Sequence, residues 1–184
     1  MAPHSRGKLA KEVETVIHLL RKKNARLVFA ESCTGGLLGS LFTEHPGVSE
    51  IFTGSFVVYR ESAKKSWLGV KNSTLKKFSA VSAECAEEMV RGALKKTPEA
   101  TLAAAVTGYL GPDGNPAGRV WISILERSAK SAQTVLIDLT HLPTQNIRKG
   151  TRKRSGFSAL ENRLRRRELA ALATLFLVRS SLEG

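Results

Sequence analysis

The stretch Ala30-Glu31-Ser32-Cys33-Thr34-Gly35-Gly36 predicts a strand that runs into a helix through a glycine turn. Residues 26–30 are apolar after the first, Arg26, and include β-branched and aromatic members, which is typical of a buried strand. Apolar residues recur at helical spacing over 37–42. The two glycines let the backbone turn sharply and approach a ligand, and the hydroxyls and free N–H groups suit an anion or a carbonyl oxygen. An ordinary turn capped by Thr34 accounts for the same pattern.

The bulk properties favour one globular domain. The chain has 184 residues, a length that fits a single core, and no apolar run approaches the ~20 residues of a membrane span. Its beginning lacks the apolar centre of a signal peptide. Cys33 and Cys85 lie far apart without partners at metal-ligand spacing, so we expect two free thiols and a cytoplasmic location.

The formal net charge of +13 is concentrated near one end of the chain. Residues 146–167 hold nine basic residues against one acid, Glu161. A solvated loop and helix face explains this excess, and so does weak binding of a polyanion or preference for a phosphorylated substrate. We interpret residues 1–184 as one domain with a basic insertion at about 144–162.

Strand and helix patterns follow one another along the chain, and the first helix is expected to pack on a sheet. Strands are expected at 26–30, 51–59, 101–106, 119–125 and 133–139, the last two as an antiparallel pair; helices are expected at 9–23, 37–42, 62–70, 73–77, 82–90 and 164–176. Ser73 or Thr74 is the expected cap of the short helix, and Ser82 that of the next. The glycine-rich loop 107–118 is neither a P-loop nor a dinucleotide fingerprint.

Two side chains near the end of the second strand are candidates for one pocket. Tyr59 ends that strand, and Lys64 follows five residues later. A lysine that is desolvated by burial loses its proton more easily and can serve as a base, although a surface lysine fits the spacing as well. Ser49 lies in the loop before the strand, where capping is its ordinary role. Cys33 has no histidine partner in sight and is expected to be a packed thiol.

Several blocks, in order along the chain, resemble the C-terminal domain of the competence/damage-inducible protein CinA. The resemblance covers most of the sequence. The blocks are Ala30-Glu31-Ser32-Cys33-Thr34-Gly35-Gly36, Pro46-Gly47-Val48-Ser49, Tyr59 with Ala63-Lys64 and Leu68-Gly69-Val70, Ala80-Val81-Ser82, Glu88-Met89, Val106-Thr107-Gly108, Gly111-Pro112-Asp113-Gly114 and Pro116-Ala117-Gly118-Arg119-Val120.

This resemblance implies a three-layer α/β/α sandwich with a mixed sheet. It also implies a metal-independent serine amidohydrolase that converts nicotinamide mononucleotide to nicotinate mononucleotide and ammonia in pyridine nucleotide salvage. The serine that matches Ser49 is then the nucleophile, and Tyr59 and Lys64 activate it. The residues expected to bind the substrate are Ser32, Thr34, Gly35, Gly36, Thr107 and Gly108, with Arg167 on the phosphate.

Some positions depart from the family pattern. The usual Tyr-Ser-Asn-Glu-Ala-Lys is Tyr59-Arg60-Glu61-Ser62-Ala63-Lys64, and Gly-Ile-Ala-Gly-Pro is Gly108-Tyr109-Leu110-Gly111-Pro112. The alternative hypothesis is therefore a catalytically altered relative that acts as a nucleotide or nucleic-acid binding module. For either function we expect a homo-oligomer that does not associate with membranes.

Overall fold

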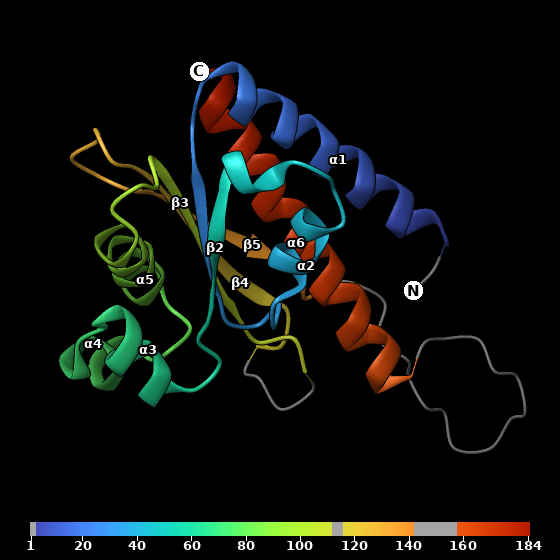
Figure 1. The fold of residues 1–184 in the computed structure, drawn as a ribbon. Helices are drawn as coiled ribbons and strands as arrows, with labels where there is room; N and C mark the ends of the chain where they lie inside the picture. Colours follow the sequence, from blue (N-terminus) through green and yellow to red (C-terminus); the bar gives the residue numbers. More distant parts are fainter. Residues whose placement is uncertain (1–2, 112–115, 142–157) are drawn as a thin grey trace, which may run out of the picture.

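The computed structural model describes residues 3–111, 116–141 and 158–184, which form one five-stranded mixed sheet between two helical layers. The strand order is β2-β1-β3-β4-β5, with β1 parallel to β2 and β3, and with β4 antiparallel to β3 and β5 (Figure 1). The strands are β1 (Leu27–Glu31), β2 (Phe52–Val57), β3 (Leu102–Gly108), β4 (Arg119–Glu126) and β5 (Gln133–Asp138).

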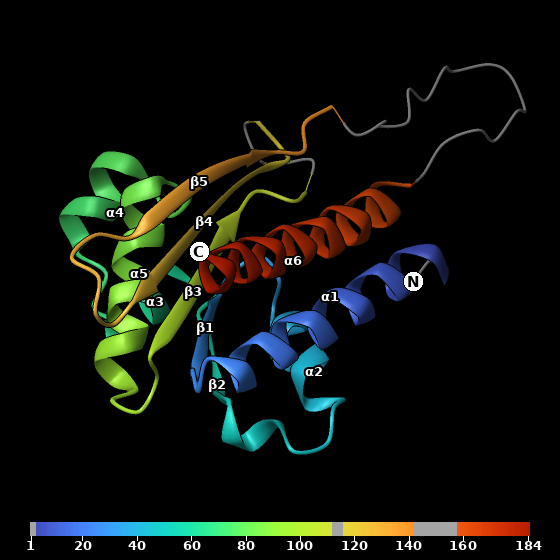
Figure 2. The ribbon, with the colours of Figure 1, turned by 90° about the horizontal axis from the view of Figure 1, so that it is seen from above.

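The helices cover both faces of the sheet, and the views in Figures 1 and 2 agree on the three layers. One layer contains α1 (Pro3–Lys22), α2 (Leu37–Thr43) and α6 (Ala159–Glu183). The other contains α3 (Glu61–Leu68), α4 (Asn72–Phe78) and α5 (Ala83–Lys96), and the short 3-10 helix η1 (Val48–Glu50) precedes β2. The predicted α/β/α sandwich with a mixed sheet is confirmed.

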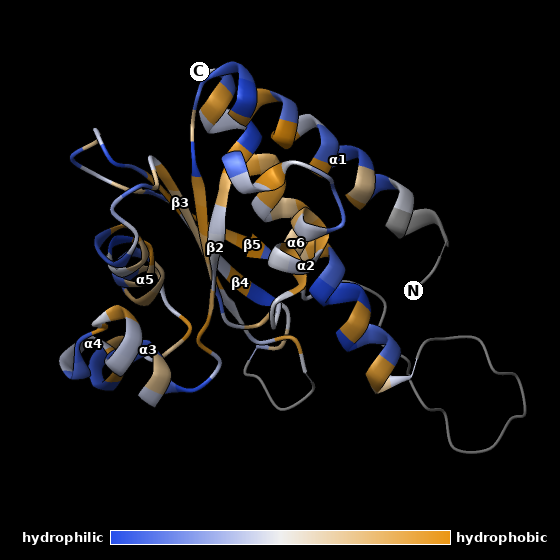
Figure 3. Cartoon of the chain, in the orientation of Figure 1, coloured by the Kyte–Doolittle hydropathy of each residue, from blue (hydrophilic) through white to orange (hydrophobic). Residues whose placement is uncertain are grey.

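Each face of the sheet has its own core because alternate strand residues point to opposite sides. In β1, Leu27 and Phe29 pack with α1, α2 and α6, whereas Val28 and Ala30 pack with the α5 layer. All five β1 residues are buried, as expected for a strand covered on both sides. Figure 3 shows hydrophobic segments in the central strands and helices that carry both hydrophobic and hydrophilic residues.

The parallel strands bring two chain segments together at one edge of the sheet. Glu31 is paired with Val106, and the Ser32 N–H donates to the carbonyl oxygen of Val106 at 3.0 Å. Ser32 and Thr107, the residues that follow this pair, therefore lie side by side at this edge of the sheet. In open α/β sheets, ligands bind beyond the carboxyl ends of parallel strands.

Some expected boundaries differ in the structure. Residues 158–162, which we had assigned to the basic insertion, belong to α6 or its cap: Ser158 and Glu161 form a capping box. The rest of the insertion lies in 142–157, outside the described residues. Lys71, and not Ser73 or Thr74, occupies the cap position of α4, whereas Ser82 caps α5 as predicted. Among the described helices, none combines the length and apolarity that crossing a bilayer requires.

Candidate active site

A pocket of about 420 Å³ lies at the carboxyl edge of β1 and β3. This volume falls in the range of roughly 300–1,000 Å³ that is common for small-molecule sites. Its walls come from the turn after β1, the residues from Tyr59 into α3, the segment before α5, the end of β3 and the start of α6. The lining residues are Ser32, Cys33, Tyr59, Glu61, Lys64, Ala80, Val81, Thr107, Gly108, Tyr109, Leu110, Gly111 and Arg163.

Lys64 is the most unusual group of the pocket. It is only 1% exposed, and its Nζ donates to Thr107 Oγ1 at 2.8 Å and to the Ala80 carbonyl oxygen at 3.0 Å. No ion pair joins it to an acid in the described part of the chain. Desolvation by burial lowers the pKa of Lys64, against a smaller opposing effect of the nearby Cys85, Cys33 and Glu61. A lysine whose pKa is lowered gives up its proton more easily, and its neutral amine can then act as a base.

Ser32 places a hydroxyl in the same pocket. Its backbone is fixed by the bond to Val106, and the residue is 7% exposed. No described residue forms a hydrogen bond with its Oγ, whereas the Thr107 hydroxyl accepts from Lys64 and donates to Ala80. Of the two serine and threonine hydroxyls that line the pocket, Ser32 has the one that is free to react.

The structure does not bring Ser49 to this pocket. Ser49 is exposed in η1, beside the start of β1: Leu27 N–H donates to the Ile51 carbonyl oxygen at 2.8 Å. The pocket lies beyond the other end of β1, and a five-residue strand spans roughly 15 Å. Ser49 is therefore not positioned to act with Tyr59 and Lys64 in this chain. The sequence missed this because η1 and Tyr59 lie at opposite ends of β2.

Tyr59 is connected to the start of α6. It is 60% exposed, and its hydroxyl accepts a hydrogen bond from Arg163 Nη2 at 2.9 Å. Arg163 lines the pocket, whereas Arg167, our choice for the phosphate, does not. Arg167 lies one helical turn further along α6, about 6 Å away in axial rise. The run of four arginines left no signal in the sequence to select the first of them.

The glycine turn is as sharp as predicted, but it is not a wall of the pocket. Gly35 and Gly36 have φ angles of 62° and 91°, and neither they nor Thr34 line the cavity. The N–H groups of Gly36, Leu38 and Gly39 donate to the buried carboxylate of Glu31 at 2.9–3.1 Å.

Glu31 thus occupies the position that we had assigned to a bound anion. Its carboxylate also accepts a hydrogen bond from Ser55 Oγ at 2.8 Å, and the side chain is fully buried. Thr34 does not cap α2 either, because its Oγ1 has no partner. The signal for Glu31 was an acid at the end of an apolar strand, four residues before the first of two glycines.

The two thiols are free and buried, as expected. Burial raises the pKa of Cys33 to about 12, so its thiol stays protonated although it lines the pocket. Burial also raises the pKa of Cys85, whose Sγ lies 4.0 Å from Lys64 Nζ. Over the described ranges, no cluster of three or more His, Cys, Asp or Glu side chains has the geometry to hold a metal ion.

Three of the positions that depart from the family pattern line the pocket, namely Glu61, Tyr109 and Leu110. Leu110 is buried, and its carbonyl oxygen accepts from Arg166 Nη1 at 3.3 Å. The larger side chains at 109 and 110 therefore leave the pocket open. Arg60 and Ser62 are not among its lining residues.

Comparison with known proteins identifies a family. The model described as the CinA C-terminal domain matches residues 9–165. A CinA-like protein of Thermotoga neapolitana is 42% identical over 153 residues, which are 81% of this chain and 35% of that protein. The CinA-like protein of Thermotoga maritima is 40% identical with the same coverage. The chain thus spans about a third of the length of these relatives.

Solved structures agree over nearly the whole chain. The competence damage-inducible protein A (ComA) of Klebsiella pneumoniae has a TM-score of 0.79 at 27% identity, covering 96% of this chain and 98% of that one. A CinA superfamily protein of Escherichia coli has a TM-score of 0.77 at 26% identity, covering 100% of this chain and 94% of that one. The shared fold includes the strands and helices that form the pocket.

Proposed function

The chain belongs to the CinA C-terminal domain family, and from this premise we propose that it hydrolyses the carboxamide of nicotinamide mononucleotide to nicotinate mononucleotide and ammonia. The observation that carries the proposal is the buried Lys64, which has no acidic partner among the described residues and shares a pocket with the unbonded hydroxyl of Ser32. An amide is a poor electrophile, so a serine needs both a base and stabilisation of the oxyanion.

In the proposed reaction, Ser32 takes the part that the sequence suggested for Ser49. Neutral Lys64 accepts the Ser32 hydroxyl proton as Oγ attacks the carboxamide carbon. The resulting tetrahedral intermediate expels ammonia, which receives its proton from Lys64. Lys64 then activates a water molecule that hydrolyses the acyl ester and frees Ser32. The bond from Lys64 Nζ to Thr107 Oγ1 fixes the direction of the amine throughout.

Substrate binding in this proposal relies on Arg163 for the phosphate. Its guanidinium is held at the pocket by the hydroxyl of Tyr59, and arginine binds phosphate through paired N–H donors. We therefore assign Tyr59 to positioning Arg163. The backbone donors of the glycine turn are not available for the phosphate because Glu31 accepts them.

The experiment is to follow ammonia release from nicotinamide mononucleotide with wild type, Ser32→Ala, Lys64→Ala and Ser49→Ala. We expect turnover by wild type and Ser49→Ala, and a loss of about 10³-fold or more in Ser32→Ala and Lys64→Ala. Absence of turnover in a folded wild type contradicts the function. Loss of turnover in Ser49→Ala with retention in Ser32→Ala contradicts our assignment of the nucleophile. Circular dichroism of each variant checks the fold.

A further inference from the structure

The pocket carries charges of opposite sign. Glu61 and Arg163 both line it, Glu61 from the first turn of α3 and Arg163 from the first turns of α6. The remaining ionisable groups of the lining are Lys64, Tyr59, Tyr109 and the protonated Cys33. A ligand that fits this arrangement has a cationic part and an anionic part.

The spacing along α3 places Glu61 close to Lys64. Glu61 and Lys64 are three residues apart on one helix, so their Cβ atoms lie on the same face at about 5–6 Å. Glu61 is close enough to contribute to the electrostatic field at Lys64. Ser32, Lys64 and Glu61 all line the pocket, so a carboxamide attacked by Ser32 has its attached ring in the same cavity as Glu61.

We propose that Glu61 makes this pocket selective for amides borne on a positively charged ring, with the phosphate held at Arg163. The inference rests on the proposed function and assigns to Glu61 the recognition of the positive charge on the substrate's ring. A carboxylate attracts a cation bound in the same pocket strongly enough to discriminate, although water screens the attraction because Glu61 is exposed. Selectivity comes from the difference between two affinities, so a neutral ring of the same shape is the proper comparison.

The competing role of Glu61 is purely structural. An acid in the first turn of a helix interacts favourably with the helix dipole, and Glu61 has this position in α3. Glu84 has the same position in α5, is also exposed and does not line the pocket. It offers a matched control for charge removal at a helix start.

The test measures binding by calorimetry with two ligands of equal shape. Nicotinamide mononucleotide has a cationic ring, and benzamide riboside 5′-monophosphate has a neutral one. The protein is Ser32→Ala to prevent turnover, or wild type if wild type is inactive, and each is studied with and without Glu61→Gln or Glu84→Gln. We expect about fivefold tighter binding of the cationic ligand, lost in Glu61→Gln and kept in Glu84→Gln.

Equal affinities for the two ligands in the parent protein, or a preference that survives Glu61→Gln, overturn the inference, as does failure of both ligands to bind. A loss of preference in Glu84→Gln as large as that in Glu61→Gln overturns it too, because a general electrostatic effect then explains the result. A wild type that binds with the expected preference but releases no ammonia contradicts the proposed function and leaves the inference supported. The preference is also expected to decrease as salt is added.

Discussion

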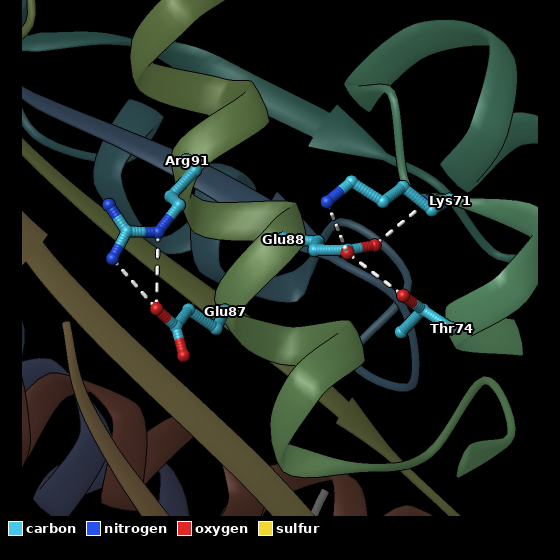
Figure 4. A network of polar contacts seen from close by, with 5 residues as sticks. All are labelled: Lys71, Thr74, Glu87, Glu88 and Arg91. Carbon is cyan, nitrogen blue, oxygen red and sulfur yellow. Dashed lines mark hydrogen bonds and ion pairs between the residues drawn. The ribbon is translucent and has the colours of Figure 1, made fainter. Parts of the chain in front are cut away.

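Two lysines show how differently this protein uses the same side chain. Lys64 is enclosed between α3, the segment before α5 and β3, with neutral partners only among the described residues. Lys71, seven residues later, has a side chain that is 75% exposed, and its Nζ lies 3.8 Å from Glu88 Oε1. Figure 4 shows Lys71 in a surface network with Thr74 and Glu88, beside the pair of Arg91 and Glu87.

The charge of Lys71 is exposed and affects stability little, whereas a charge on the buried Lys64 would lower the stability of the fold. Exposed pairs contribute roughly 0–1 kcal/mol each, and their loss is easily tolerated. A buried amine without an acidic partner is disfavoured unless it loses its proton. A buried Lys64 at the pocket is therefore consistent with a reaction that uses its neutral form as the base.

The largest difference between the two lysines is expected when each is replaced by methionine. Lys64→Met is expected to lower kcat/KM for ammonia release by about 10³-fold, while the free energy of unfolding changes by less than about 2 kcal/mol because the volume is kept. Lys71→Met is expected to leave kcat/KM within about twofold. Kinetics and chemical denaturation of both variants provide the measurement, and equal losses in the two variants contradict the distinction.

The pH dependence of stability tests the same contrast without catalysis. Burial lowers the pKa of Lys64 below 10.5, so the folded state holds fewer protons than the unfolded chain between the lowered pKa and 10.5. The free energy of unfolding of wild type relative to Lys64→Met therefore rises with pH through this window, and it is lowest below the lowered pKa. Denaturation at a series of pH values measures it. A relative stability that falls as pH rises contradicts the lowered pKa.

Two carboxylates extend the comparison from cations to anions. Glu31 and Glu88 each accept hydrogen bonds from backbone N–H groups and from a hydroxyl. Glu31 is fully buried and accepts four such bonds, whereas Glu88 accepts two. In Glu31→Gln, the amide group faces N–H donors that it cannot accept. We expect the free energy of unfolding to fall by about 2–3 kcal/mol, measured by urea denaturation. A change below about 0.5 kcal/mol contradicts the structural role of Glu31.

Glu88→Gln is expected to have a smaller effect. The Glu88 side chain is 21% exposed and accepts from Lys71 N and Thr74 Oγ1, both at 2.8 Å. Loss of its charge weakens these bonds but leaves acceptors, so we expect a decrease of about 1 kcal/mol in the free energy of unfolding. Ammonia release is expected to be unaffected. A decrease as large as that in Glu31→Gln makes the distinction by burial untenable.

The smallest effect is expected at the other surface pair. Arg91 Nη2 lies 2.7 Å from Glu87 Oε1, and both side chains are more than 40% exposed. Glu87→Gln is expected to change the free energy of unfolding by no more than about 0.5 kcal/mol, an effect that added salt reduces further. Denaturation at low and high salt measures both quantities. A larger effect that is insensitive to salt contradicts this estimate.

Most of the fold follows from local patterns. The apolar run of β1, the period of the helices and the antiparallel pair β4 and β5 were all predicted, because each depends on residues close in sequence. The predicted strand ends were less accurate, since pairing with a neighbour extends β3 to Gly108 and ends β2 at Val57. The candidate site was predicted in part: Ser32, Tyr59, Lys64, Thr107 and Gly108 meet in one pocket.

The family, the layers of the fold and the glycine turn could all be predicted from the sequence, because each depends on residues close together along the chain. The tertiary structure alone decided which hydroxyl, which arginine and which acid line the pocket. Ser49 and Ser32 both lie beside plausible turns, yet the carboxyl edge of β1 and β3 brings Ser32, and not Ser49, into one pocket with Lys64. The N–H groups at the start of α2 suited a bound anion, but they donate to the carboxylate of Glu31. This occurs because the turn folds back on the end of its own strand. Spacing predicts what a segment can do, whereas long-range packing determines which groups meet.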